Sequence, residues 1–193
     1  MTAHQAALEA LTRYFGYDSF RPGQQGIVEA LLAGRDVLGV MPTGAGKSVC
    51  YQIPAALSPG MTLVISPLIS LMRDQVDALN DLGLPAAFIN TTQPPDEQAM
   101  VFAQAAAGQI KLLYVAPERL ETGRFRDFAA RTPISLIAVD EAHCVSQWGQ
   151  DFRSSYLGIG DFIAGLPQRP PVGAFTATAT ERVRRDIVGL LGL

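Results

Sequence analysis

A lysine and a serine end a short glycine-containing loop. Residues 41–48 read Met-Pro-Thr-Gly-Ala-Gly-Lys-Ser, with an apolar run before them and an amphipathic one after them. Backbone N–H groups of such a loop and a helix N-terminus bind phosphate, while the lysine reaches the β and γ phosphates and the serine binds Mg²⁺. The loop therefore predicts a nucleoside triphosphate site. The residues expected to contact the nucleotide here are Thr43, Gly44, Ala45, Gly46, Lys47 and Ser48.

This loop departs from the usual phosphate-loop pattern at two positions. The pattern begins with glycine where this chain has Met41, and Ala45 stands where a third glycine is often found. A loop that precedes an amphipathic helix by chance is the alternative explanation. A strand before the loop and a helix directly after it are the context that phosphate binding requires, and they favour the phosphate site.

A pair of carboxylates follows another apolar run. Asp140 and Glu141 come directly after residues 135–139. We expect Asp140 to hold Mg²⁺ through water, and Glu141 to orient and deprotonate the attacking water. Lys47 and this catalytic pair are expected to converge across neighbouring strand ends; a solvated acidic turn is the alternative. His143 fits two interpretations equally, a link between nucleotide state and the next motif or a local hydrogen bond.

Alternating strand and helix patterns must position these residues. Strands are expected at 36–41, 62–66, 86–89, 111–115, 135–139 and 172–175. Helices are expected at 5–14, 24–33, 47–56, 68–82, 96–107, 124–131 and 181–191. This alternation predicts a three-layer α/β fold with a doubly wound, mainly parallel sheet. Ligands of such sheets bind beyond the carboxyl ends of the strands, where both motifs fall.

Composition limits the class of protein. The 193 residues suit one globular domain, and the net charge of −3 does not indicate a nucleic-acid binder, so phosphate contacts must come from local placement. Cys50 and Cys144 lack CxxC spacing, which predicts reduced thiols and no zinc site. No apolar run reaches the length of a membrane span. We therefore expect a cytoplasmic protein, associated with the nucleoid in a bacterium, without a membrane partner.

Several motifs together resemble one known family. Residues 41–48 continue as Val-Cys-Tyr-Gln, and Asp-Glu-Ala-His at 140–143 continues as Cys-Val-Ser-Gln-Trp-Gly. This combination resembles the RecQ-type DNA helicases of superfamily two. The resemblance covers nearly the whole chain and implies a RecA-like P-loop NTPase fold. It also implies ATP and Mg²⁺ as cofactors, and 3′→5′ unwinding of single-stranded or forked DNA in repair and recombination.

The N-terminal part resembles the adenine-recognition motif of that family. Gln24 could pair with the adenine edge, Tyr17 could stack on the base, and Arg21 could cover its other face. A polar residue at a helix start is the alternative for Gln24. Core packing is the alternative for Tyr17.

Further motifs imply strand contacts. Residues 66–75 and 116–120 resemble motifs that bind the phosphates of a DNA strand, here through Ser66 and Arg119. Residues 176–179 resemble the motif that couples ATP hydrolysis to movement, here through Thr176 and Thr178. Local pairing is the alternative for Arg119, and a threonine-rich helix cap for the threonines. The arginines at 182, 184 and 185 are expected on a solvated helix face.

Residues 146–153 resemble the aromatic-rich loop that senses single-stranded DNA. Trp148, Phe152 and Arg153 are its candidate DNA contacts, because bases stack on aromatic rings. Core packing is the alternative for Trp148. Gln150 replaces an expected histidine and Ser154 an expected proline, and the first change puts one signalling contact in doubt.

The resemblance implies that residues 1–193 form only the first motor lobe, with helices and the adenine motif at 1–34. The second lobe, its arginine finger and the C-terminal domains are expected to be absent, so this fragment should bind ATP weakly and not unwind. An RNA helicase lobe is one alternative, although Ser-Gln-Trp-Gly at 146–149 favours DNA. The other alternative is a non-catalytic module that only binds a nucleotide or a DNA strand. The intact catalytic motifs argue against it, because they keep Lys47, Ser48, Asp140 and Glu141.

Overall fold

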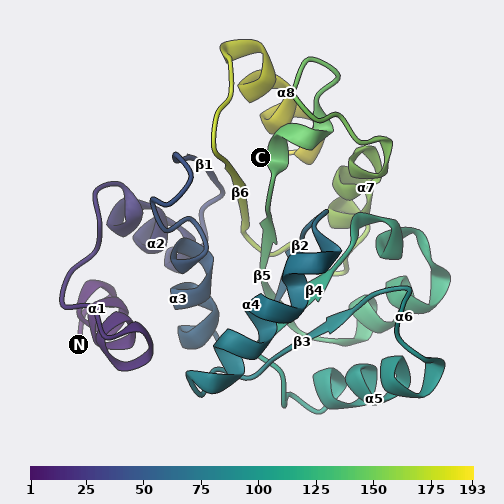
Figure 1. Ribbon diagram of the computed structural model, residues 1–193, viewed down its shortest axis with the longest axis horizontal. Coiled ribbons are helices and arrows are strands. Elements are labelled where there is room, and N and C mark those ends of the chain that lie inside the picture. Colours follow the sequence, from purple (N-terminus) through teal and green to yellow (C-terminus); the bar gives the residue numbers. More distant parts are fainter.

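Six parallel strands form one sheet in the order β1-β6-β5-β2-β4-β3 (Figure 1). The computed structural model describes residues 1–193. The strands are β1 (Val37–Val40), β2 (Met61–Ile65), β3 (Ala86–Ile89), β4 (Leu112–Val115), β5 (Ile134–Val139) and β6 (Val172–Thr176). Every hydrogen-bonded pair of strands is parallel. The predicted parallel α/β fold is confirmed, and each of the six expected strands is present within two residues of its expected bounds.

Eight α-helices and three 3₁₀ helices connect and cover the strands. The α-helices are α1 (Ala3–Phe15), α2 (Gln24–Leu32), α3 (Val49–Leu57), α4 (Ile69–Asp81), α5 (Pro95–Ala106), α6 (Gly123–Arg131), α7 (Ile159–Ala164) and α8 (Glu181–Leu191). The 3₁₀ helices are η1 (Pro117–Glu121), η2 (Ala142–Val145) and η3 (Ser154–Gly158). Helix α7 was not predicted from the sequence, because its six residues span less than two helical turns and are too few to show a period of 3.6.

Helices cover both faces of the sheet, because side chains alternate along each strand. Val64, Tyr114 and Ala138 point into the core shared with α2, α3 and α4. Their neighbours on the same strands point into the larger core shared with α5 to α8. Helix α1 forms an outer layer, where Ala7 and Leu11 pack on α2 and α3 (Figure 1).

Two glycines let an aromatic ring lie flat against the sheet. A Cβ atom on Gly39 of β1 would stand 2.9 Å from the Phe175 ring, and one on Gly173 would stand 2.8 Å from it. The Phe175 ring in turn lies 5.5 Å from the ring of Tyr51 in α3. These contacts fix α3, and with it the loop at 41–48, against the sheet.

The order of the strands corrects one expectation. Lys47 follows β1 and Asp140 follows β5, and β6 lies between these two strands. The expectation that the two motifs follow neighbouring strands was wrong, because chain order does not encode the order of strands in a sheet. The consequence is that Thr176, at the end of β6, stands between the two motifs.

Candidate active site

The loop at 41–48 presents unpaired backbone donors. Gly44 and Gly46 have left-handed φ values of 83° and 80°, which glycine adopts without steric cost. The N–H groups of Gly44, Gly46, Lys47 and Ser48 donate no hydrogen bond within the chain. Successive free N–H groups in such a turn form a concavity that binds anions. The loop therefore has the geometry of a phosphate cradle.

The ammonium group of Lys47 lies over this loop. Its Nζ atom donates to the carbonyl oxygen of Met41 at 3.2 Å. An ammonium group has three protons to donate, so this bond leaves others for a phosphate. Met41 itself is buried, which explains why this first loop position accepts a large apolar residue instead of glycine.

Two residues from the N-terminal segment hold the loop from outside. The Gln24 side chain is only 3% exposed and accepts a hydrogen bond from the Arg21 N–H at 2.8 Å. Its Nε2 atom donates to the carbonyl of Gly46 at 3.0 Å and, more weakly, to that of Ala45 at 3.4 Å. The Arg21 guanidinium donates to the carbonyl of Gly44 at 2.8 Å. The chain thus clamps the loop at three consecutive carbonyls.

This clamp changes the interpretation of the adenine motif. The Gln24 amide protons are engaged by the loop, so only one acceptor position on Oε1 remains for a base. Tyr17 is 49% exposed, so core packing of this ring was wrong. The Cζ atom of Arg21 lies 5.9 Å from the centroid of the Tyr17 ring, within the range of a cation–π contact.

Asp140 is held rigidly at the end of β5. Its N–H donates to the carbonyl of Ile65 at 2.9 Å, and its carbonyl accepts from the Tyr156 hydroxyl at 2.8 Å. The pKa of Asp140 is raised to about 6, mainly by burial and also by the charge of Glu141, while a hydrogen bond from the Glu141 N–H and the charge of Lys47 oppose the rise. A carboxylate in this environment gains from a nearby cation. Tyr156 was not found from the sequence, because no motif or period marks it.

Glu141 has an unusual backbone. Its φ of 50° makes it the only non-glycine residue with positive φ. The Oε2 atom of the Glu141 carboxylate lies 3.4 Å from His143 Nδ1. Such a conformation costs about 1–2 kcal/mol in a residue other than glycine. Backbone strain of this kind occurs often at functional sites.

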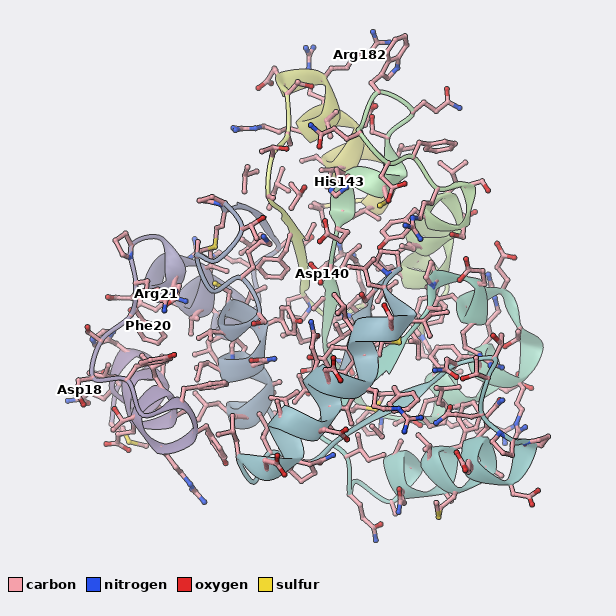
Figure 2. All side chains as sticks on the ribbon, in the orientation of Figure 1. Asp18, Phe20, Arg21, Asp140, His143 and Arg182 are labelled. Carbon is pink, nitrogen blue, oxygen red and sulfur yellow. The ribbon has the colours of Figure 1, made fainter.

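His143 connects the carboxylates to β6. Its Nδ1 atom lies 2.8 Å from the Thr176 hydroxyl, which donates to the carbonyl of Thr178 at 3.2 Å. The Thr176 hydroxyl therefore contacts both the His143 ring and the carbonyl of Thr178. Figure 2 shows His143 beyond Asp140, toward α8. The structure shows the local hydrogen bond of His143, and its partner belongs to the next motif; the coupling of nucleotide state through it stays a prediction.

One cavity of about 320 Å³ joins these parts. Its lining includes Lys47, Ser48, Ser66, Asp140 and Glu141. A hydroxyl and two carboxylates suit a hard cation that takes oxygen ligands, and Mg²⁺ completes such a set with phosphate oxygens and water. No group of three or more His, Cys, Asp or Glu side chains could hold a metal by itself. The donors therefore fit Mg²⁺ bound together with a nucleotide.

The residues predicted to contact a DNA strand lie at the ends of several different β-strands. Ser66 is buried, and its hydroxyl accepts from the Leu68 N–H at 3.4 Å. Arg119 lies half-buried on η1, and its guanidinium makes no hydrogen bond or ion pair. Thr176 is fully buried, so its side chain offers no surface for direct contact with a DNA strand. Thr178 lines a second cavity of about 350 Å³ together with His143 and Trp148.

The loop at 146–153 is exposed. Trp148 is 61% exposed, so core packing of this ring was wrong, and Phe152 is also exposed. Arg153 pairs with Asp151 at 2.9 Å. Gln150 and Ser154, which depart from the family pattern, lie on the surface, and Gln150 lines the second cavity. None of the helices combines the length and the apolar character that a membrane span requires.

A parallel sheet with a phosphate cradle after β1 and carboxylates after β5 defines a nucleotide-binding domain of the RecA-like type. The family model of the DEAD/DEAH box helicases matches residues 21–187. The chain belongs to this family.

The ATP-dependent DNA helicase RecQ of Haemophilus influenzae is 49% identical over 97% of this chain, and that of Pasteurella multocida 48% over 98%. The chain spans about 30% of the length of these curated relatives. Among solved structures, a hypothetical ATP-dependent RNA helicase from Sulfolobus tokodaii superimposes with a TM-score of 0.72 over 97% of this chain and 54% of its own, at 22% identity. This likeness shows a shared fold.

Proposed function

We propose that residues 1–193 are the ATP-binding motor lobe of an ATP-dependent DNA helicase. The proposal rests on one observation above all, the cavity that Lys47, Ser48, Asp140 and Glu141 share. Relatives that are 42–49% identical over nearly the whole chain are named DNA helicases, which favours DNA over RNA. In the whole protein, ATP hydrolysis would drive 3′→5′ unwinding during repair and recombination at the bacterial nucleoid.

The chain's own groups suffice to bind and orient the triphosphate. The free N–H groups of the loop and the Lys47 ammonium bind the β and γ phosphates. Ser48 and, through water, Asp140 would hold Mg²⁺, which when bound neutralises charge on the phosphates. Glu141, which lines the same cavity, would orient the attacking water and take its proton.

The clamp gives Gln24 a second role besides base recognition. Its Oε1 atom keeps one acceptor position for the adenine amino group, while its Nε2 atom holds Gly46. Tyr17 and Arg21 offer an exposed stacking surface for the base. Adenine binding would therefore act directly on the shape of the phosphate loop.

A DNA strand is the second proposed ligand. Ser66 and Arg119 would contact its phosphates, and Trp148, Phe152 and Arg153 its bases. Thr176, Thr178 and His143 would relay the state of the cavity to this surface. A second motor lobe would close the cavity and supply an arginine to it.

Nucleotide binding tests the proposal directly. We expect the unmodified chain to bind a fluorescent ATP analogue weakly and only with Mg²⁺, and Lys47→Ala to bind it at least tenfold more weakly. Lys111→Ala is the matched control, because Lys111 donates to the carbonyl of Ser58, remote from the cavity. Equal affinity of the Lys47→Ala variant would favour an inert module. Strand separation by this chain alone would contradict the need for a second lobe.

A further inference from the structure

Arg182 lies face-on to the exposed indole of Trp148. The Cζ atom of Arg182 is 3.6 Å from the centroid of the Trp148 ring, which is close contact for a stacked guanidinium. Arg182 belongs to the first turn of α8, and Figure 2 shows it at the outer end of that helix, beside the loop at 146–153. With 61% of Trp148 exposed, the contact leaves much of the indole open to solvent.

A second contact fixes this arrangement. The Ser146 hydroxyl donates to Oδ2 of Asp186 at 2.6 Å and accepts from the backbone N–H of Trp148 at 3.1 Å. Asp186 follows Arg182 by four residues, so both lie on one face of α8. Helix α8 is anchored by the buried Val183 and by its N-cap Thr180, which accepts from the Val183 N–H. The indole is therefore positioned before any ligand arrives.

The guanidinium group of Arg182 has no polar partner, unlike the guanidinium groups of neighbouring arginines. Arg153 pairs with Asp151, and Arg185 approaches Glu181 at 3.8 Å. Arg184 donates to the carbonyl of Ala179 at 3.1 Å. The guanidinium of Arg182 makes no hydrogen bond or ion pair, so its plane covers the indole while its N–H edges are free to donate. An aromatic face beside free guanidinium edges matches the chemistry of a nucleotide, a flat base joined to an anionic phosphate.

We propose that Arg182 and Trp148 together form one nucleotide subsite, in which a base stacks on the open indole face and Arg182 binds a neighbouring phosphate. The inference rests on the proposed strand-binding function and adds α8 to it. Arg182 is exposed on α8, as expected of a solvated helix face, and the proposal gives this exposed residue a ligand. The arrangement is a platform: Arg182 stays on the indole when the strand binds.

Intrinsic fluorescence tests the contact without DNA, because Trp148 is the only tryptophan. The variants are Arg182→Ala, Arg182→Lys and, as matched control, Arg185→Ala on the same helix. We expect acrylamide to quench Arg182→Ala more strongly than the unmodified chain, and Arg185→Ala to match the unmodified chain. Equal quenching in all variants would show that Arg182 does not cover the ring and would overturn the proposal.

Strand affinity tests the subsite itself, with fluorescein-labelled oligothymidylate followed by anisotropy over a series of KCl concentrations. We expect Arg182→Ala to bind about five- to tenfold more weakly and to reduce the salt slope by about 0.7, as one lost phosphate contact requires. Arg182→Lys should keep the slope and lose part of the affinity, and Arg185→Ala should change affinity less than twofold. Equal affinity of Arg182→Ala and Arg185→Ala would overturn the subsite, and tighter binding by Arg182→Ala would show that Arg182 is a lid. An unmodified chain that binds no oligothymidylate would instead refute the strand-binding function, and the subsite with it.

Discussion

The Nδ1 atom of His143 lies 2.8 Å from the hydroxyl oxygen of Thr176, a residue 33 positions further along the chain. This contact bridges the ends of β5 and β6. It joins the carboxylates of the cavity to the segment that leads into α8 and the exposed loop.

Replacing Thr176 by valine removes this bridge while keeping the shape of the side chain. The Nδ1 atom of His143 loses its hydrogen-bond partner and the carbonyl of Thr178 loses its donor, at a site where Thr176 is fully buried. We expect Thr176→Val to lower the free energy of unfolding by about 1–2 kcal/mol and Thr176→Ser to restore most of it. Urea denaturation followed by circular dichroism measures both. A valine variant as stable as the unmodified chain would argue against the hydrogen bond.

Gln24 and Gln25 form a natural pair of test and control. Gln24 is buried and holds the loop, whereas Gln25 is exposed and bonds only to Glu29. We expect Gln24→Ala to weaken binding of the GTP analogue by about tenfold, because a loosened loop loses phosphate contacts whatever the base. Binding of the ATP analogue should weaken at least as much, because the contact with adenine is lost as well. Titration with fluorescent analogues of both nucleotides measures this, and Gln25→Ala should change neither affinity. A loss confined to the adenine analogue would show base recognition alone.

The strained backbone of Glu141 predicts a conflict between stability and activity. Glu141→Gly removes the backbone strain, because glycine adopts the left-handed conformation without steric cost, while Glu141→Ala keeps the strain. We expect the glycine variant to be more stable than the alanine variant by about 0.5–1 kcal/mol, with hydrolysis lost in both. Thermal unfolding compares them. The opposite order of stability would mean that the φ of 50° costs nothing.

Both cysteines should resist alkylation in the folded chain. Burial raises the pKa of Cys50 and of Cys144 to about 12, and the charge of Asp151 also raises that of Cys144. The reactive thiolate is then about one part in 10⁴ at pH 8, against a large fraction for an exposed thiol. Mass spectrometry after iodoacetamide treatment should find neither cysteine modified until a denaturant is added. Rapid modification of native Cys144 would indicate that the loop at 146–153 opens.

The strands were predictable because their apolar runs are covered on both faces, as in 111–115 and 135–139. The phosphate loop and the carboxylates were predictable because local order, strand then loop then helix, carries the signal. The position of β6 was not, because it depends on how crossovers pack and not on any one segment. Composition alone also could not predict that Trp148 is exposed, because tryptophan is usually buried. Arg182 was grouped with Arg184 and Arg185 because spacing alone cannot reveal which of three arginines finds a ring.

Helix α1 lies outside the residues that the family model matches, which begin at Arg21. Yet Ala7 and Leu11 cover the apolar sides of Val28 and Ile53. A protein shortened to start at residue 21 would lose Tyr17 and expose that apolar surface to water, at a cost of about 25 cal/mol for each Å² uncovered. Helix α1 therefore stabilises the chain although it precedes the matched residues, and through Ile53 it supports from behind the helix that follows the nucleotide loop.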